Sequence, residues 1–178
     1  MATKIRLVLF DIDGVFTDNR LYVGSEGEVF KAFNARDGVG IALLQSHGIE
    51  CGTISGKRSA ALEYRMRELK MDIVSLGVHD KLGTLEEIRR DNGYTHAEIA
   101  FVGDDVIDLS VMNAVALSYA PADAHPLVID AADYVMRTNG GGGVVREVAE
   151  HLLEISGIAR AEQYDRLMEQ WGRRQYAQ

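Results

Sequence analysis

The stretch LVLFDIDGVFTD, Leu7–Asp18, decides the fold that we expect for this chain. Four apolar residues run directly into two aspartates, Asp11 and Asp13, which a glycine follows. A short apolar run that ends at a turn signal is typical of a buried strand. Alternation along an extended chain places both aspartates on the same side, where they repel each other unless a cation lies between them. The pair therefore indicates a site for a hard divalent cation, although a DxD sequence alone also fits a helix cap and a solvated turn.

Bulk composition indicates one soluble domain, residues 1–178, with 47% hydrophobic residues. The net charge of -8 argues against a nucleic-acid-binding surface. A single cysteine, Cys51, excludes an internal disulfide framework and fits a reducing compartment. No apolar run is long enough to span a membrane, and MATKIR reaches the first strand without room for a signal peptide. We therefore expect a cytoplasmic protein.

Apolar segments alternate with helical patterns along the chain, which predicts an α/β fold: a three-layer, Rossmann-like parallel sheet with helices on both faces. The strands are expected at 5–10, 49–54, 72–76, 98–102, 114–118 and 134–136. The helices are expected at 38–47, 59–70, 81–92, 105–113, 122–131 and 144–156, with a last helical stretch after Gly157 to about Trp171 and a loose tail over 173–178.

Three local signals refine this expectation. Residues 20–33 alternate on both sides of a glycine-containing turn, which predicts a β-hairpin insert after the first strand, either a lid or an edge ornament. Asp37 is the expected N-cap of the first helix. The run Gly140–Gly143 is open to two interpretations, a mobile gate over the site or a tight turn that needs positive φ angles.

Polar side chains follow several different segments, and in a parallel sheet all of them can converge on its carboxyl edge. These residues are Asp11, Asp13, Ser55, Lys81, Asp104, Asp105 and Asp108. Carboxylates, a hydroxyl and a lysine together suit metal-assisted phosphoryl transfer, because the phosphoryl group carries spread-out negative charge in transit. A carboxylate such as Asp11 can attack phosphorus, and one two residues on can protonate the leaving oxygen and then deprotonate water.

The chain resembles the haloacid dehalogenase superfamily of phosphohydrolases in four motifs, which stand in order: Asp11-x-Asp13-Gly-Val-x-Thr17, Ser55-Gly56, Lys81 and Gly103-Asp104-Asp105-x-x-Asp108. Within it, the chain is similar to the 3-deoxy-D-manno-octulosonate 8-phosphate (KDO 8-P) phosphatases. That likeness lies in FDIDGVFTD, YVGSEGEVFKAFNARDG, GDDVIDLSVM, ADAHP and the GG-x-G-V-x-R-E-V stretch, and it covers residue 6 to about residue 153.

The resemblance implies Asp11 as nucleophile and Asp13 as general acid and base. It implies a Mg²⁺ ion held by Asp11, the backbone carbonyl of Asp13, and Asp104. Substrate or phosphate contacts are expected from Ser55, Gly56, Lys57, Arg58, Arg65 and Lys81, with Asp105 and Asp108 as supporting carboxylates. The family also implies a capless fold and a homotetramer in which hairpin 20–33 reaches a neighbouring subunit's site.

Two departures bear on specificity. Close relatives tend to carry Thr-Gly-Arg where this chain has Ser55-Gly56-Lys57, and lysine lacks the planar fork of arginine, so Arg58 or Arg65 is expected to compensate. The glycine loop often carries a basic residue where this chain has Gly142.

We therefore expect a Mg²⁺-dependent phosphatase that acts on 3-deoxy-D-manno-octulosonate 8-phosphate in lipopolysaccharide precursor synthesis. Two alternatives stay open: a phosphatase for a nine-carbon, sialic-acid-type 9-phosphate, and a non-catalytic, phosphatase-like oligomerisation module. A receiver domain is excluded, because its acidic pair belongs to the first strand and its acceptor to the third. A phosphomutase is disfavoured, because the segment between Asp18 and Ser55 holds no substantial cap domain.

Overall fold

A six-stranded parallel sheet forms the centre of the molecule in a computed structural model that describes residues 4–175. The strands run in the order β5-β4-β1-β6-β7-β8, so the strand that carries Asp11 and Asp13 lies in the middle. Their bounds are β1 Leu7–Phe10, β4 Glu50–Ser55, β5 Ile73–Leu76, β6 Ile99–Val102, β7 Leu117–Ala120 and β8 Tyr134–Val135.

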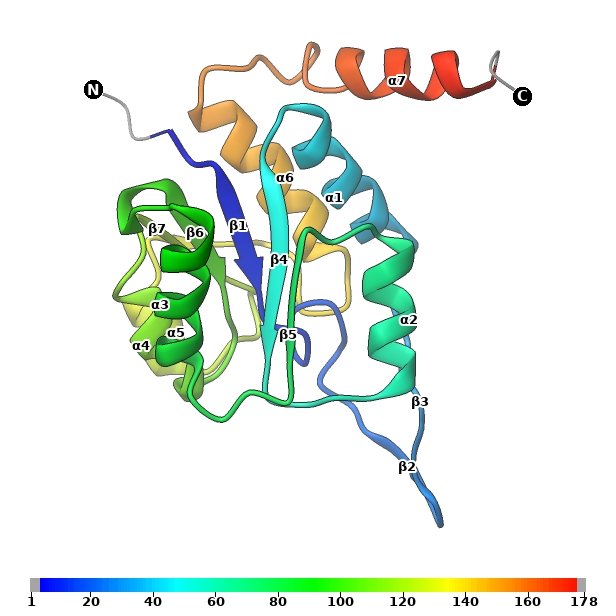
Figure 1. Ribbon diagram of the computed structural model, residues 1–178, viewed down its shortest axis with the longest axis vertical. Coiled ribbons are helices and arrows are strands. Elements are labelled where there is room, and N and C mark those ends of the chain that lie inside the picture. Colours follow the sequence, from blue (N-terminus) through cyan, green and yellow to red (C-terminus); the bar gives the residue numbers. More distant parts are fainter. Residues whose placement is uncertain (1–3, 176–178) are drawn as a thin grey trace.

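Helices cover both faces of the sheet, as the sequence predicts (Figure 1). Helices α1, α2 and α6 pack on one face and α3, α4 and α5 on the other. Their bounds are α1 Ala35–Ser46, α2 Ala60–Glu68, α3 Lys81–Asn92, α4 Leu109–Met112, α5 Pro126–Ala131, α6 Val144–Ile155 and α7 Asp165–Gln175. Short 3₁₀ turns, η1 His96–Glu98 and η2 Val106–Asp108, precede β6 and α4.

Strand β1 joins the two hydrophobic cores because its side chains alternate between the faces of the sheet. Leu7 and Leu9 pack among the helices of one face, whereas Val8 and Phe10 pack on the other. All four side chains are fully buried, and each contributes roughly 1.5–3 kcal/mol relative to an exposed position. This burial fixes the strand that presents Asp11.

The insert after β1 is an antiparallel hairpin of β2 Tyr22–Gly24 and β3 Gly27–Phe30. It projects from the body at the carboxyl edge of the sheet (Figure 1). Tyr22 and Phe30 stack across the two strands with ring centroids 4.3 Å apart. The predicted hairpin is therefore confirmed.

Two helix starts differ from the prediction. Helix α1 is capped by Asn34, whose side chain accepts a hydrogen bond from the Arg36 N–H at 3.0 Å. The prediction of Asp37 as N-cap was wrong because Asp37 lies within the first turn, fully buried against α6. Helix α5 begins only at Pro126, which suits a first helical position because its missing N–H has no partner there.

Two later elements are displaced along the chain. Strand β7 begins three residues after the expected position, because the turn that ends α4 continues to Ala114. The last helix starts at Asp165 rather than soon after Gly157, and it continues to Gln175, so the expected loose tail is helical at 173–175. Residues 176–178 of that tail lie outside the described residues. Over residues 4–175, no helix is both long enough and apolar enough to cross a bilayer.

Candidate active site

The loop after β1 places Asp11 at the carboxyl edge of the sheet. Its backbone N–H donates to the Val102 carbonyl at 2.9 Å, which continues the pairing of β1 with β6. Gly14 then turns the loop back with φ +85°. A Cβ atom at Gly14 would lie 1.9 Å from Asp104 Oδ2, so both the backbone conformation and the close approach of Asp104 favour glycine here.

Three buried carboxylates meet below this loop. Asp11, Asp104 and Asp108 offer oxygens that lie within 4.8 Å of one another. They come from β1 and from the segment after β6, which are neighbours in the sheet. The expected convergence of these segments is therefore observed.

Lys81 supplies positive charge to this cluster from the first residue of α3, a helix that Asp80 caps. Its Nζ lies 3.1 Å from Asp11 Oδ2 and 2.6 Å from Asp108 Oδ1, and its side chain is 3% exposed. Burial lowers the pKa of Lys81, but Asp11 and Asp108 outweigh burial and raise it above its ordinary value. Lys81 therefore stays an ammonium group beside the predicted nucleophile.

One lysine does not neutralise three carboxylates, and the pKa values show the imbalance. Burial, followed by the charge of Asp108, raises the pKa of Asp11 to about 7. Burial, followed by the charges of Asp11 and Asp108, raises the pKa of Asp104 to about 8. Asp104 Oδ1 is also buried without a hydrogen-bond partner among the described residues. A bound divalent cation would resolve both features, so this donor set fits Mg²⁺.

Asp108 has a supporting position within the cluster. Its Oδ1 contacts Lys81, and its Oδ2 accepts from the backbone N–H of Asp104 at 3.1 Å. Both oxygens are thereby engaged, and the side chain is fully buried. Asp105 caps the following turn, where it accepts from the Val106 N–H at 2.7 Å. These contacts hold both side chains in place, and the supporting roles that the family resemblance implies for them stay predictions.

Ser55 ends β4 and, together with Asp11, lines a cavity of about 300 Å³. Its Oγ accepts from the Lys57 N–H at 3.3 Å, and its carbonyl accepts from the Val78 N–H at 3.0 Å, which shapes the loop. The cavity is lined by Asp11, Asp13, Asn19, Ser55, Gly56, Lys57, Asp104, Asp105 and Ile107. It therefore gathers most of the predicted site residues, with Lys81 directly behind Asp11.

Two predicted substrate contacts are not brought to this cavity. Arg58 is exposed and pairs with Glu63 at 2.7 Å. Arg65 pairs with Glu68 at 2.7 Å and lies over the Phe33 ring, 5.8 Å from its centroid. Within this chain neither arginine lies beside Asp11, and a substrate contact from either stays a prediction.

Two residues that sequence reasoning missed contact the site. The Asn19 side chain donates to Asp104 Oδ2 at 3.0 Å from a backbone with φ +64°, a conformation that asparagine tolerates. Lys31, at the end of the hairpin, contacts Asp13 Oδ1 through its Nζ. Neither contact follows from spacing, because both residues reach the site from loops.

The glycine loop packs directly on the catalytic loop. The Gly141 N–H donates to the Val15 carbonyl at 2.9 Å, and a Cβ atom at Gly140 would lie 2.0 Å from the Gly14 carbonyl oxygen. Gly141 itself has φ +68°. These contacts favour the tight turn over the mobile gate.

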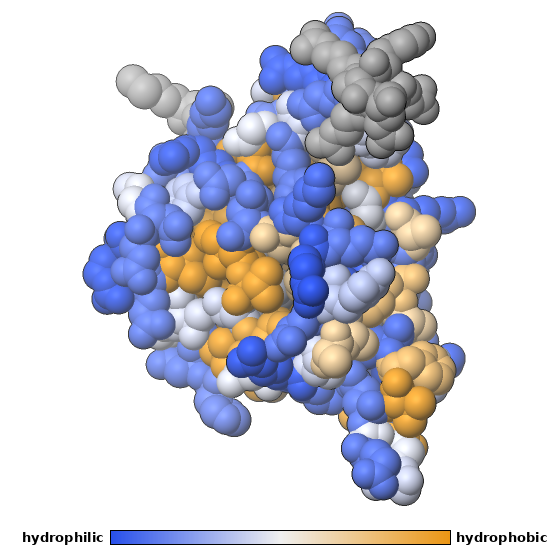
Figure 2. Space-filling view, turned by 45° about the vertical axis from the view of Figure 1, so that its right-hand side comes forward, coloured by the Kyte–Doolittle hydropathy of each residue, from blue (hydrophilic) through white to orange (hydrophobic). Residues whose placement is uncertain are grey.

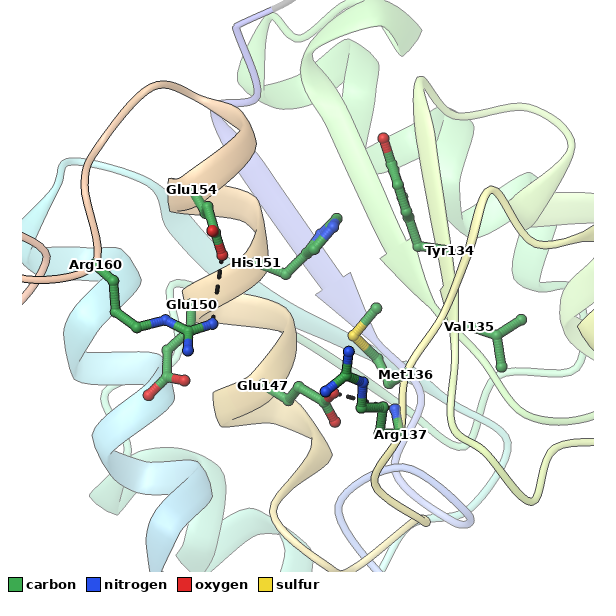
Figure 3. Close-up of a pocket in the computed structure, with 9 residues that line it drawn as sticks. All are labelled: Tyr134, Val135, Met136, Arg137, Glu147, Glu150, His151, Glu154 and Arg160. Carbon is green, nitrogen blue, oxygen red and sulfur yellow. Dashed lines mark hydrogen bonds and ion pairs between the residues drawn. The ribbon is translucent and has the colours of Figure 1, made fainter.

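A larger cavity of about 420 Å³ lies away from this site, between α6 and the edge strand β8 (Figure 3). Its carboxylates already have partners within the chain: Glu154 pairs with Arg160 at 3.4 Å, Glu150 pairs with Arg146 at 3.0 Å, and Glu147 accepts from the backbone N–H of Arg137 at 3.1 Å. Asp11 and Asp104, with pKa values raised to about 7 and about 8, line the smaller cavity instead, and the buried Lys81 contacts Asp11 there. We therefore assign the active site to the smaller cavity.

The chain is similar to known proteins along most of its length. Residues 59–148 match the family model of haloacid dehalogenase-like hydrolases. The chain is 43% identical over 156 residues to the 3-deoxy-D-manno-octulosonate 8-phosphate phosphatase of Escherichia coli K12, covering 88% of this chain and 83% of the relative.

Solved structures are similar along most of the chain. The crystal structure of the same phosphatase from Yersinia pestis has a TM-score of 0.84 at 42% identity, covering 88% of this chain and 85% of that one. The Moraxella catarrhalis enzyme, solved with magnesium, phosphate and KDO, has a TM-score of 0.82 at 32% identity, covering 86% and 88%. The cobalt-bound Haemophilus influenzae enzyme has a TM-score of 0.84 at 35% identity, covering 88% and 91%.

The order of the four motifs, the buried carboxylate cluster with its lysine, and identity at this level along most of both chains agree with one another. The chain belongs to the haloacid dehalogenase-like hydrolases, and within them it is a phosphoric monoester hydrolase.

Proposed function

We propose that this protein hydrolyses 3-deoxy-D-manno-octulosonate 8-phosphate to 3-deoxy-D-manno-octulosonate and phosphate, with Mg²⁺, in the synthesis of lipopolysaccharide precursors. One observation carries the proposal: the cluster of Asp11, Asp104 and Lys81 is complete in a chain 43% identical to an octulosonate phosphatase. The related Moraxella catarrhalis enzyme binds magnesium, phosphate and KDO together. We also propose a cytoplasmic location, which fits the single buried cysteine.

In this proposal, Asp11 and Asp104 would hold Mg²⁺ with their carboxylates, together with the backbone carbonyl of Asp13. Asp108 is not needed as a ligand, because Lys81 and a backbone N–H already occupy its oxygens. When bound, the ion supplies positive charge to the phosphoryl oxygens and to the carboxylates around it. It also favours the ionised form of Asp11, whose pKa is about 7 without a cation.

The reaction proceeds in two displacements. Asp11 attacks phosphorus through a carboxylate oxygen, and the bond from phosphorus to the sugar oxygen breaks while Asp13 gives that oxygen a proton. Asp13 then takes a proton from water, which attacks the aspartyl phosphate and releases inorganic phosphate. Lys81 and Ser55 lie beside Asp11 and hold the phosphoryl oxygens during both steps. Gly56 and Lys57 line the same cavity on the substrate side.

We further propose that the chain forms one domain with an insert at 20–33 and a C-terminal segment that ends in α7. The packing of Leu167, from α7, into the same core as α1 and α6 supports this. A homotetramer in which the hairpin covers a neighbouring site is proposed from the family resemblance. Apolar side chains on the arm support it: Leu21, Val23, Val29 and Phe30 are each more than half exposed. Figure 2 shows this apolar surface on the arm that projects at the lower right.

The test is phosphate release with Mg²⁺ and with EDTA. The panel holds the eight-carbon acid 8-phosphate, a nine-carbon sialic-acid-type 9-phosphate and glucose 6-phosphate. Asp11→Asn should abolish turnover, whereas Asp91→Asn, an exposed aspartate on α3, should not. Mg²⁺-dependent preference for the eight-carbon substrate supports the proposal. Preference for the nine-carbon acid would keep the mechanism and change the substrate. No turnover by folded protein would refute the proposed activity and favour a phosphatase-like oligomerisation module.

A further inference from the structure

We propose that Lys31, at the foot of the hairpin, is a positioning residue for Asp13. It holds one oxygen of the Asp13 carboxyl group so that the other oxygen serves proton transfer to the substrate. This inference rests on the proposed function, in which Asp13 is the general acid and base. It adds to that function a residue outside the four sequence motifs, carried by a different element.

The contacts of Lys31 define this role. Its Nζ contacts Asp13 Oδ1 and lies 3.1 Å from Glu28 Oε2, on strand β3. The Lys31 side chain is 1% exposed, although the hairpin around it projects into solvent. An ammonium group removed from water to this extent is retained only where it has strong partners. Lys31 is therefore built into the site rather than resting on its surface.

The charge of Lys31 is secure in this position. The carboxylates of Asp13 and Glu28 both contact its ammonium group and compensate the positive charge that is removed from water. Hydrogen bonds in which the donor or the acceptor is ionised are shorter and roughly twice as strong as those between neutral groups. The interaction with Asp13 is of this kind, and it restrains a side chain that would otherwise rotate freely about χ2.

The two oxygens of Asp13 consequently differ. Lys31 and the Thr17 hydroxyl, the latter at 3.5 Å, both contact Oδ1. We assign proton transfer to Oδ2, because Asp13 also lines the cavity that holds Asp11 and Ser55. A misplacement of about 1 Å at a reacting group can lower the rate by about 10²-fold, so loss of the fixed carboxyl orientation should lower the rate measurably.

The experiment uses two substrates that differ in how much they need a general acid. The leaving group of the sugar-acid phosphate is an alkoxide, which departs slowly unless it receives a proton. The leaving group of p-nitrophenyl phosphate is a stable phenolate that needs no proton. For Lys31→Met, kcat/KM with the sugar-acid phosphate should fall by about 10- to 100-fold, below the full value of a general acid. With p-nitrophenyl phosphate it should fall by less than about threefold. Lys31→Arg, which keeps the charge, should restore part of the loss.

Three controls separate the possible failures. Lys4→Met removes an exposed lysine and should leave kcat/KM unchanged with both substrates. Asp13→Asn should show the same contrast between substrates, only larger. Circular dichroism and thermal melting establish that each variant folds, and Lys31→Gln replaces Lys31→Met if the latter does not.

The outcomes are distinct. An equal loss with both substrates, or no loss, in a folded Lys31 variant would overturn the inference while leaving the proposed function intact. No contrast in Asp13→Asn, or a wild-type protein without phosphatase activity, would refute the proposed roles and this inference with them.

Discussion

Replacement of Lys81 by methionine tests whether the carboxylate cluster is held together by charge. The variant removes a buried ammonium that lies 3.1 Å from Asp11 and 2.6 Å from Asp108, and it keeps a side chain of similar length. Breaking a buried ion pair by removing one partner costs about 3–5 kcal/mol, because a charge is left buried without compensation. For a chain of this length, each kcal/mol changes Tm by about 2–4 °C, so we expect a fall of roughly 10 °C without metal.

The loss should depend on pH and on magnesium. Lys81 lowers the pKa of Asp11, so its removal moves that pKa further above about 7. The folded variant then binds a proton that the unfolded chain does not, and the destabilisation is smaller at about pH 6 than at about pH 8. Because Mg²⁺ supplies charge to the same carboxylates, saturating Mg²⁺ should raise Tm more in the variant than in the wild type.

The assay is thermal melting in EDTA and in Mg²⁺ at both pH values, with phosphate release measured in parallel. Lys57→Met is the matched control for stability, since Lys57 is exposed at the same cavity. Lys81→Met should lose at least about 10²-fold in kcat/KM, because a charge that stabilises the phosphoryl group is gone. A folded variant that loses less than about 1 kcal/mol in EDTA at the higher pH would refute the reasoning, because the cluster would then not depend on Lys81.

Two further predictions concern the packing around the site. Gly140→Ala should destabilise the protein by about 1–3 kcal/mol and lower kcat, because the added Cβ would lie 2.0 Å from the Gly14 carbonyl oxygen. Gly172→Ala, where a Cβ meets nothing within 4 Å, should be neutral or stabilising, and equal effects of the two in urea titrations would contradict this. Burial raises the pKa of Asp37 from 3.8 to about 6, so between these pH values the folded protein keeps a proton that the unfolded chain loses. The free energy of unfolding therefore falls as the pH rises from about 4 to about 6. Asp37→Asn carries no such cost, and its stability relative to wild type should increase by about 2 kcal/mol between about pH 4 and pH 8 in urea unfolding; a difference that does not change with pH would show that the charge is not the cause.

The sheet and its catalytic edge could be predicted from the sequence because strand geometry fixes them. Alternation sends Leu7 and Leu9 to one core and Val8 and Phe10 to the other, and this leaves Asp11 at the end of a central strand. The parallel order of the strands then brings the residues after β1, β4 and β6 to one edge. Lys81 was found because it opens a helix directly at that edge.

The errors arose where two local signals compete. Asn34 and Asp37 are both good capping residues, and only the packing of α6 against α1 shows that Asp37 is drawn into the core, where it accepts from the Arg146 N–H at 3.4 Å. Similarly, the glycine run fits either a gate or a turn until the Gly14 carbonyl is seen beside Gly140. In each case the deciding contact joins segments that are far apart in the sequence.

The positions of Lys31 and Asn19 show why motif spacing locates the reacting groups but not all of the residues that orient them. A residue at a strand end is placed by the sheet, so its position follows from a regular geometry. Lys31 directly follows a hairpin that projects from the body, so its contact with Asp13 depends on how that hairpin is placed against the body. The same dependence makes the contact informative. A displaced hairpin would carry Lys31 away from Asp13 and so release the orientation of the carboxyl group that transfers protons. If the hairpin also packs on a neighbouring subunit, assembly and proton transfer are coupled through this one ion pair.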